Sequence, residues 1–156
     1  MTNTFNLTLQ RMGNLVGILL LGCLLAGCAT ATGPKFSGIV KPAADKGNVY
    51  LYRTDGLFAM GEAFTVTIDE QQIELLPNAS YLHFTMSPGR HALKIKPTAL
   101  GKTSELAIKV EAGKTQFYQY DFVSGPLGNM FFLGSAIEPR DEAAALAALR
   151  ELQAAK

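Results

Sequence analysis

The sequence predicts an all-β fold, an antiparallel β-sandwich of about seven to eight strands with one C-terminal helix. Apolar residues recur with a period of two in short runs, as in Phe64–Ile68, where threonines separate the apolar side chains. Gly, Pro, Asn and Asp residues interrupt these runs at nearly regular intervals, which is typical of turns between strands. Strands with one apolar face each can bury those faces against a second sheet. An open barrel is the alternative that this pattern leaves.

Each apolar run bounded by turn residues is a predicted strand. In chain order, these strands are Val49–Arg53, Phe64–Ile68, Gln72–Leu76, Tyr81–Met86, His91–Ile95, Leu106–Val110, Gln116–Val123 and Met130–Ile137. Pro88-Gly89 is a strong turn signal, because Pro presets φ at one position and Gly accepts a positive φ at the next. Asp69-Glu70-Gln71 is the predicted turn between the second and third strands.

A single helix is expected at residues 139–155. Pro139 suits the first helical turn, and Asp141 follows where the helix dipole favours negative charge. Leu146, Leu149 and Leu152 form a narrow apolar stripe. We expect this stripe to pack on an open face or end of the sandwich, and a partner-binding helix is the alternative.

The N-terminus has the layout of a secretory signal. Arg11 is the one charge in residues 1–14, and Leu15–Ala26 is an apolar run of 12 residues. Such a run is too short for an ordinary spanning helix, which needs about 20 residues. The run ends in Leu25-Ala26-Gly27-Cys28, which resembles the lipobox of a bacterial lipoprotein signal. The resemblance implies that residues 1–27 are removed and that Cys28 carries diacylglycerol and an N-acyl chain; an ordinary thiol at Cys28 is the alternative.

Removal of this leader changes the composition of the chain. It takes away Cys23, so no disulfide can form within the mature chain, and it leaves equal numbers of basic and acidic side chains. That balance gives no electrostatic reason to expect a nucleic acid partner. We expect membrane attachment through the lipid. Ala29 stands where an inner-membrane lipoprotein commonly has Asp, so the resemblance favours the outer membrane. We expect the domain on the periplasmic face, and the cell surface is the alternative.

The mature chain is divided into a tether and a domain. Residues 28–47 are predicted to form a lipidated, flexible tether, because only Phe36, Ile39 and Val40 are substantial apolar groups there. Stretched out, such a tether could reach about 60 Å. Residues 48–156 are predicted to form one sandwich domain with its helix.

A family resemblance covers about residues 47–123. The residues that carry it are Val49-Tyr50-Leu51-Tyr52-Arg53, Val66-x-Ile68-Asp69, Leu76, Ser80-Tyr81, Pro88-Gly89-x-His91, Val110-x-Ala112-Gly113-Lys114 and Tyr118. They resemble a family of small bacterial lipoproteins whose β-domain has no assigned function, and more loosely the PEGA-type sandwich domains. The resemblance implies fold and location and transfers no catalytic residue. Those families commonly have Gly where this chain has Glu70, so we expect a slightly longer loop there instead of a tight hairpin.

The sequence contains no recognisable catalytic motif, and we expect a protein that is not an enzyme. No serine lies in a G-x-S-x-G context, and no phosphate-binding glycine loop precedes a helix. His83 should point away from the sandwich core, and His91 begins a strand. Two histidines without cysteine partners make a weak case for a metal site. We therefore expect no metal and no cofactor other than the covalent lipid.

Two features are candidate binding surfaces. Tyr118 and Tyr120 share one face of a strand with Phe122, and an exposed aromatic row could stack on sugar rings. The favoured interpretation is that the row faces the core. The second feature is the apolar segment 125–133, which contains Leu127, Met130, Phe131 and Phe132. It fits an interaction loop, a membrane contact or, as we favour, an edge strand covered by the terminal helix.

Three functions follow from these features. The favoured hypothesis is an envelope lipoprotein that acts as a non-enzymatic protein-binding or structural module, with an envelope protein as its partner. The alternative is a glycan or peptidoglycan-binding module that uses Tyr118 and Tyr120. A hydrolase is the third hypothesis, and it lacks a catalytic constellation in the sequence.

Overall fold

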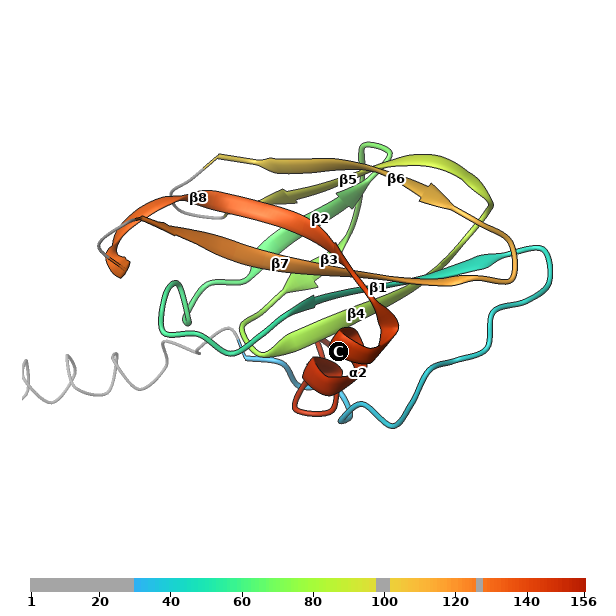
Figure 1. Ribbon diagram of the computed structural model, residues 1–156, viewed down its shortest axis with the longest axis horizontal. Coiled ribbons are helices and arrows are strands. Elements are labelled where there is room, and N and C mark those ends of the chain that lie inside the picture. The colour runs from blue at the N-terminus through green and yellow to red at the C-terminus, as the bar shows by residue number, and fades with distance from the viewer. Residues whose placement is uncertain (1–29, 98–101, 126–127) are drawn as a thin grey trace, which may run out of the picture.

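Two stacked sheets form the body of the protein, and one helix lies on the outside of one of them (Figure 1). The computed structural model describes residues 30–97, 102–125 and 128–156, but not the side chains of residues 123–133. The elements are β1 (Gly47–Arg53), β2 (Phe64–Ile68), β3 (Gln71–Leu76), β4 (Ser80–Met86), β5 (Gly89–Lys96), β6 (Ser104–Val110), β7 (Thr115–Gly125), β8 (Gly128–Arg140), α2 (Glu142–Leu149) and β9 (Gln153–Ala154).

The all-β sandwich expected from the sequence is confirmed, with nine strands in the described residues instead of seven to eight. One sheet has the strand order β8-β7-β1-β4-β9 and the other the order β3-β2-β5-β6. The first sheet is mixed, because β1 runs parallel to β7 and β4 runs parallel to β9. The ninth strand, β9, has only two residues and was not expected from the sequence.

The main core lies between the two sheets. Val49 and Leu51 of β1 face Val66, Leu93 and Ile95 of the second sheet, and all five side chains are fully buried. Burying each of them contributes about 1.5–3 kcal/mol relative to exposure. The period-two pattern of the sequence therefore marks the inner face of each strand.

The outer face of the five-stranded sheet is also covered. Tyr50, Tyr52 and Phe117 point to this side and pack against Ala145 and Leu149 of α2. The expectation that the helix covers an open face is therefore confirmed.

The helix itself is shorter than the expected 139–155. Asp141 caps its N-terminus, with Oδ1 accepting a hydrogen bond from the amide of Ala144 at 2.8 Å. Pro139 belongs to β8, and β9 at the other end pairs with Ser80 and Tyr81 of β4. The helix ends early because the chain must leave it to form this added strand, which sequence propensity alone does not reveal.

The expected flexible tether is instead packed on the domain over residues 30–46. The amide of Gly33 donates to the carbonyl of Ala154 at 3.0 Å, so the segment runs beside β9. Phe36 lies edge-on to the rings of Tyr50 and Tyr81, with centroid distances of 6.0 and 5.6 Å. The composition of the segment suggested flexibility because it contains few apolar residues. One aromatic side chain, Phe36, packed between two tyrosines is enough to hold it on the domain.

The loop between β2 and β3 corrects a second expectation. Ile68 pairs with Gln71, so only Asp69 and Glu70 lie in the turn, and both have positive φ, at 50° and 67°. The turn is therefore a tight two-residue hairpin. The longer loop expected from Glu70 in place of Gly is wrong. Contacts from the next hairpin hold the turn, since Asp69 Oδ1 accepts from the amide of Ala92 at 2.9 Å. These contacts offset the cost of the left-handed conformation in residues other than Gly.

A buried arginine holds the loop between β1 and β2, residues 54–63. Arg53 is 2% exposed, and its guanidinium donates to the carbonyls of Glu62, Phe58 and Ala59 at 2.8, 3.1 and 2.7 Å. The guanidinium carbon also lies 4.5 Å from the ring centre of Phe64. This side chain therefore fixes the path of a loop that contains no regular structure.

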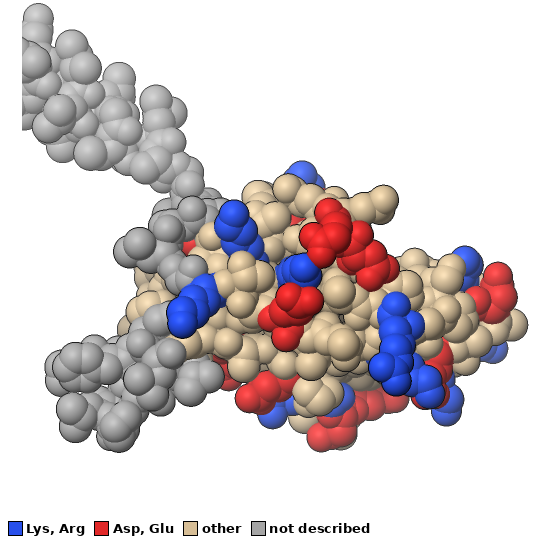
Figure 2. Space-filling view, turned by 90° about the horizontal axis from the view of Figure 1, so that it is seen from above, with Lys and Arg blue, Asp and Glu red and all other residues tan. Residues whose placement is uncertain are grey.

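The surface carries charges of both signs. Lys and Arg residues lie interspersed with Asp and Glu on the face that Figure 2 shows, so the described part of this face has no patch of one sign. None of the helices in the described ranges has the length and apolar character needed to span a bilayer.

Candidate functional site

The two tyrosines predicted as candidate binding residues lie inside the sandwich. Tyr118 is 6% exposed and Tyr120 is 1% exposed, and both belong to the core between the sheets. Burial raises the pKa of both hydroxyls. The structure thus confirms the favoured interpretation, in which the aromatic row faces the core. The rings of Tyr118 and Tyr120 are therefore not available to stack on a sugar.

The other predicted site residues fall largely outside the described part of the chain. Leu25, Ala26, Gly27 and Cys28 precede residue 30, and Leu127 lies in the gap at 126–127. Met130, Phe131 and Phe132 belong to β8 by their backbone, while their side chains are outside the described residues. The lipobox and the apolar segment therefore stay predictions.

A cavity of about 370 Å³ lies at the edge of β4, and we call it the outer cavity. Residues 81–84 of β4 form its floor, Ile73 and Glu74 of β3 form one wall, and the packed N-terminal segment contributes Val40. Lys156 reaches the same cavity and pairs with Glu74 at 3.4 Å. Three parts of the chain that are distant in sequence therefore enclose this site.

The cavity exists because β9 covers only part of β4. The pairing of β4 with β9 involves Ser80 and Tyr81, and the carbonyl of Tyr81 accepts from the amide of Ala155 at 3.0 Å. Main-chain groups alternate in direction along a strand, so those of His83 and Thr85 point to the same edge as the carbonyl of Tyr81. Among the described residues no strand pairs with this second half of the edge.

His83 lines the cavity on β4 and is one of several polar side chains there, beside Glu74 and Lys156. Its ring stacks on Tyr50 with the centroids 4.5 Å apart, and its Nε2 is buried without a hydrogen-bond partner in the described structure. Burial lowers the pKa of His83, so the ring is neutral at pH 7. In a neutral imidazole, a ring nitrogen without a partner can donate or accept one hydrogen bond with a bound group, depending on the tautomer. The parity argument placed this residue away from the core correctly, but the N-terminal segment and Tyr50 cover it.

Two exposed apolar side chains lie among the residues that line the cavity. Val40 is 54% exposed and Ile73 is 43% exposed, and both line the cavity. Ile73 lies at a β-bulge, since the register passes from Val66 opposite Glu74 to Thr67 opposite Gln72. A bulge on an edge strand changes the direction of one side chain. These two side chains form the apolar part of the cavity rim, beside the open strand edge.

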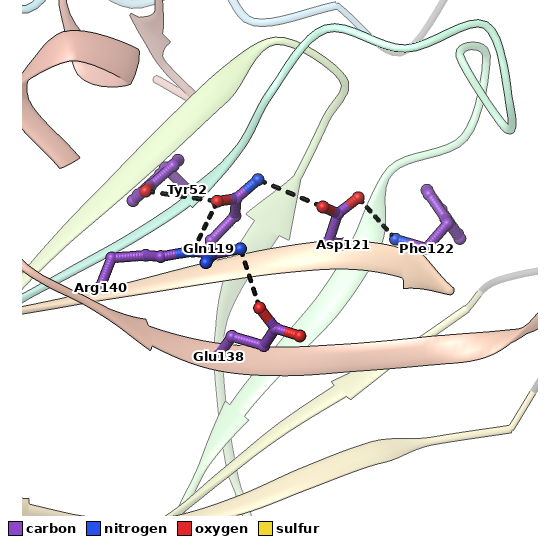
Figure 3. A network of polar contacts seen from close by, with 6 residues as sticks. All are labelled: Tyr52, Gln119, Asp121, Phe122, Glu138 and Arg140. Atoms are coloured by element: carbon purple, nitrogen blue, oxygen red, sulfur yellow. Dashed lines mark hydrogen bonds and ion pairs between the residues drawn. The ribbon is translucent and has the colours of Figure 1, made fainter. Parts of the chain in front are cut away.

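A polar network on the same sheet has the opposite character, because its groups satisfy one another (Figure 3). Gln119 Oε1 accepts from Arg140 Nε at 2.9 Å and from the hydroxyl of Tyr52 at 3.5 Å. Arg140 also pairs with Glu138 at 2.8 Å, and Asp121 Oδ1 accepts from the amide of Phe122 at 2.8 Å. We therefore assign this network to the joining of β1, β7 and β8.

The remaining polar pair of interest joins two turns. His91 Nδ1 lies 2.6 Å from Asp69 Oδ2, and His91 Nε2 lies 2.9 Å from the carbonyl of Ser87. Both contacts are best made by a doubly protonated imidazolium, and the hydrogen bond to Asp69 raises the pKa of His91. With both nitrogens engaged, His91 holds the two turns together. Within the described ranges no group of three His, Cys, Asp or Glu residues is arranged to hold a metal ion.

Residues 43–136 match a family model described as a protein of unknown function, DUF2846. The chain belongs to the DUF2846 family. Its matched region begins before β1 and ends within β8, so it includes eight of the nine strands in whole or in part and excludes α2. No curated protein matches the chain. The DUF2846 region contains the strand edge and the β1, β3 and β4 residues of the outer cavity, whereas the cavity residues of the N-terminal segment and of the C-terminus lie outside it.

Sequence reasoning missed the outer cavity, although one signal for it was present. Val49-Tyr50-Leu51-Tyr52 is apolar at every position, and the whole of β1 is buried. A continuous apolar run indicates a strand that is covered on both faces. The run therefore indicates a second covered face but does not say which segment covers it.

Proposed function

We propose that this DUF2846 protein is a lipid-anchored, non-enzymatic module of the bacterial cell envelope that binds an extended segment of a partner protein. The lipobox Leu25–Cys28 and its leader support the anchor, and Ala29 supports the outer membrane. The observation that carries the binding function is the unpaired half of the β4 edge, which lies open beside the outer cavity.

An extended peptide fits the chemistry of this site. A strand added along β4 beyond Tyr81 would satisfy the main-chain groups of His83 and Thr85. Its side chains would alternate, so one of them enters the cavity against His83 while a neighbour packs on the rim at Val40 and Ile73. Main-chain pairing supplies affinity in this mode, and the cavity selects the side chain.

The lipid anchor is tested by metabolic labelling with a palmitate analogue. The wild-type protein should be labelled, and Cys28→Ala should not. Equal labelling of both proteins would contradict the assignment of Cys28.

Peptide binding is tested with a photo-crosslinking amino acid placed at Ile73 in intact cells. The matched control carries the same amino acid at Ala107, an exposed position on β6, the other edge strand of the same sheet. We expect a discrete protein adduct from position 73 and none from position 107. The absence of an adduct at position 73, or equal adducts from both positions, would refute binding at this edge.

A further inference from the structure

The tip of the loop between β1 and β2 presents apolar side chains to solvent. Leu57 is 89% exposed and Met60 is 56% exposed, with Phe58 between them at 45%. The rest of the large apolar side chains on the described surface with comparable exposure belong to the rim of the outer cavity or to β3. Leu57, Phe58 and Met60 therefore form a separate apolar surface, which we call the loop tip.

The exposure of the loop tip comes from a defined conformation. Arg53 bonds three carbonyls of the loop, as described above. The side-chain amide of Asn78 donates from Nδ2 to Asp55 Oδ1 at 2.6 Å, and the ring centroid of Phe58 lies 4.9 Å from that of Phe122. These contacts hold the base of the loop while its apolar tip points outward.

The N-terminal segment leaves the domain beside this loop. Thr30 forms a bridge with Asn78, and a hollow of about 500 Å³ is lined by Thr30, Leu57 and Met60. Cys28 is two residues before Thr30, a span of at most about 7 Å in an extended chain. Because residues 30–46 are packed on the domain, they add no reach.

The two charged side chains that line the hollow beside the loop tip are acidic. Asp55 and Glu151 line the hollow beside it, and Glu62 follows in the same loop. An apolar contact is independent of headgroup charge, whereas acidic side chains disfavour an anionic surface. The partner that suits the loop tip is therefore the interfacial region of an uncharged or weakly charged bilayer.

We propose that the loop tip inserts Leu57 and Met60 into the membrane interface next to the lipid on Cys28, which fixes the orientation of the domain on the bilayer. This inference rests on the proposed lipidation of Cys28. With the acylated residue within a few ångströms of Thr30, this end of the domain lies at the headgroups. Apolar side chains at that depth leave water for the boundary between headgroups and acyl chains. The outer cavity then stays accessible to a partner from the side.

The test uses the lipidated mature protein reconstituted into phosphatidylcholine vesicles that contain acyl-brominated lipid. Loss of Cys23 with the leader and acylation of Cys28 would leave an introduced cysteine as the one free thiol. An environment-sensitive fluorophore is attached at Leu57→Cys or at Met60→Cys. The control is Ala112→Cys, an exposed position in the turn between β6 and β7 at the other end of the sandwich (Figure 1).

We expect brominated lipid to remove most of the fluorescence at positions 57 and 60 and to leave that at position 112 unchanged. Vesicle flotation of the same samples reports anchoring separately. If the protein floats but no position is quenched, or all three are quenched equally, loop insertion is refuted and the anchor stands. If the wild type does not float, the lipid anchor is refuted and the orientation argued from it is refuted too.

Discussion

Replacing Arg53 tests whether one buried guanidinium organises the loop between β1 and β2. The side chain is 2% exposed and donates to three loop carbonyls, at 2.7 to 3.1 Å. Burial lowers the pKa of Arg53, while the nearby Tyr120 and Glu62 raise it. The charge thus carries a desolvation cost that its hydrogen bonds must offset.

The expected loss of stability follows from those contacts. Three hydrogen bonds at about 1 kcal/mol each give about 3 kcal/mol. The contact with the Phe64 ring adds about 1 kcal/mol, and relief of the buried charge returns about 1 kcal/mol. Arg53→Met, which keeps much of the side-chain volume, should therefore destabilise the fold by about 3 kcal/mol. Arg53→Lys keeps the charge but loses the planar fork, and it should cost about 1–2 kcal/mol.

Urea unfolding of the unlipidated Cys28→Ser form, followed by circular dichroism, measures these changes. With a slope near 2 kcal/mol per molar urea, Arg53→Met should lower the midpoint by about 1.5 M, and Arg53→Lys by about 0.5–1 M. A loss below about 1 kcal/mol for Arg53→Met would refute the account. A larger loss for Arg53→Lys than for Arg53→Met would show that the buried charge, and not its hydrogen bonds, dominates.

Three further predictions concern the turns and the outer face. His91→Asn should lower the free energy of unfolding mainly between pH 3.8 and pH 6.5, the ordinary pKa values of Asp and His. In the folded protein the pKa of Asp69 is lowered, chiefly by the hydrogen bond from the amide of Ala92, and the pKa of His91 is raised, chiefly by its hydrogen bond to Asp69. The contribution of Asp69 is lost as the pH falls through its lowered pKa, and that of His91 as the pH rises through its raised pKa. Urea midpoints across the pH range measure this, and a pH-independent difference would contradict it. Glu70→Gly should stabilise the fold by about 0.5–1 kcal/mol, because relief of the positive-φ penalty exceeds the small contribution of the exposed Glu70–Lys94 ion pair that it removes, and a lower thermal midpoint would argue against this. Leu149→Ala should cost about 2–5 kcal/mol because Leu149 of α2 is fully buried against the five-stranded sheet, and a loss below 1 kcal/mol would contradict that packing.

The candidate site could be predicted only in part from the sequence. The parity of β4 placed His83 away from the sandwich core, and the apolar run in β1 signalled two covered faces. Neither pattern revealed that Phe36 of the N-terminal segment packs across this face. Contacts between residues far apart in sequence leave no period in either segment, so they could not be predicted from local pattern.

The sequence by itself determined the strands, because each inner face repeats with the period of a pleated chain and each turn carries its own residue chemistry. It also contains a local motif, Leu25–Cys28, that resembles a lipobox, and lipidation there stays a prediction. Only the tertiary structure decided the tight turn at Asp69 and Glu70, where the neighbouring hairpin supplies the stabilising contacts. The same holds for the end of α2, since β9 forms only when β4 offers an edge. The physical reason is that burial and pairing with distant residues outweigh local propensities of about 1 kcal/mol.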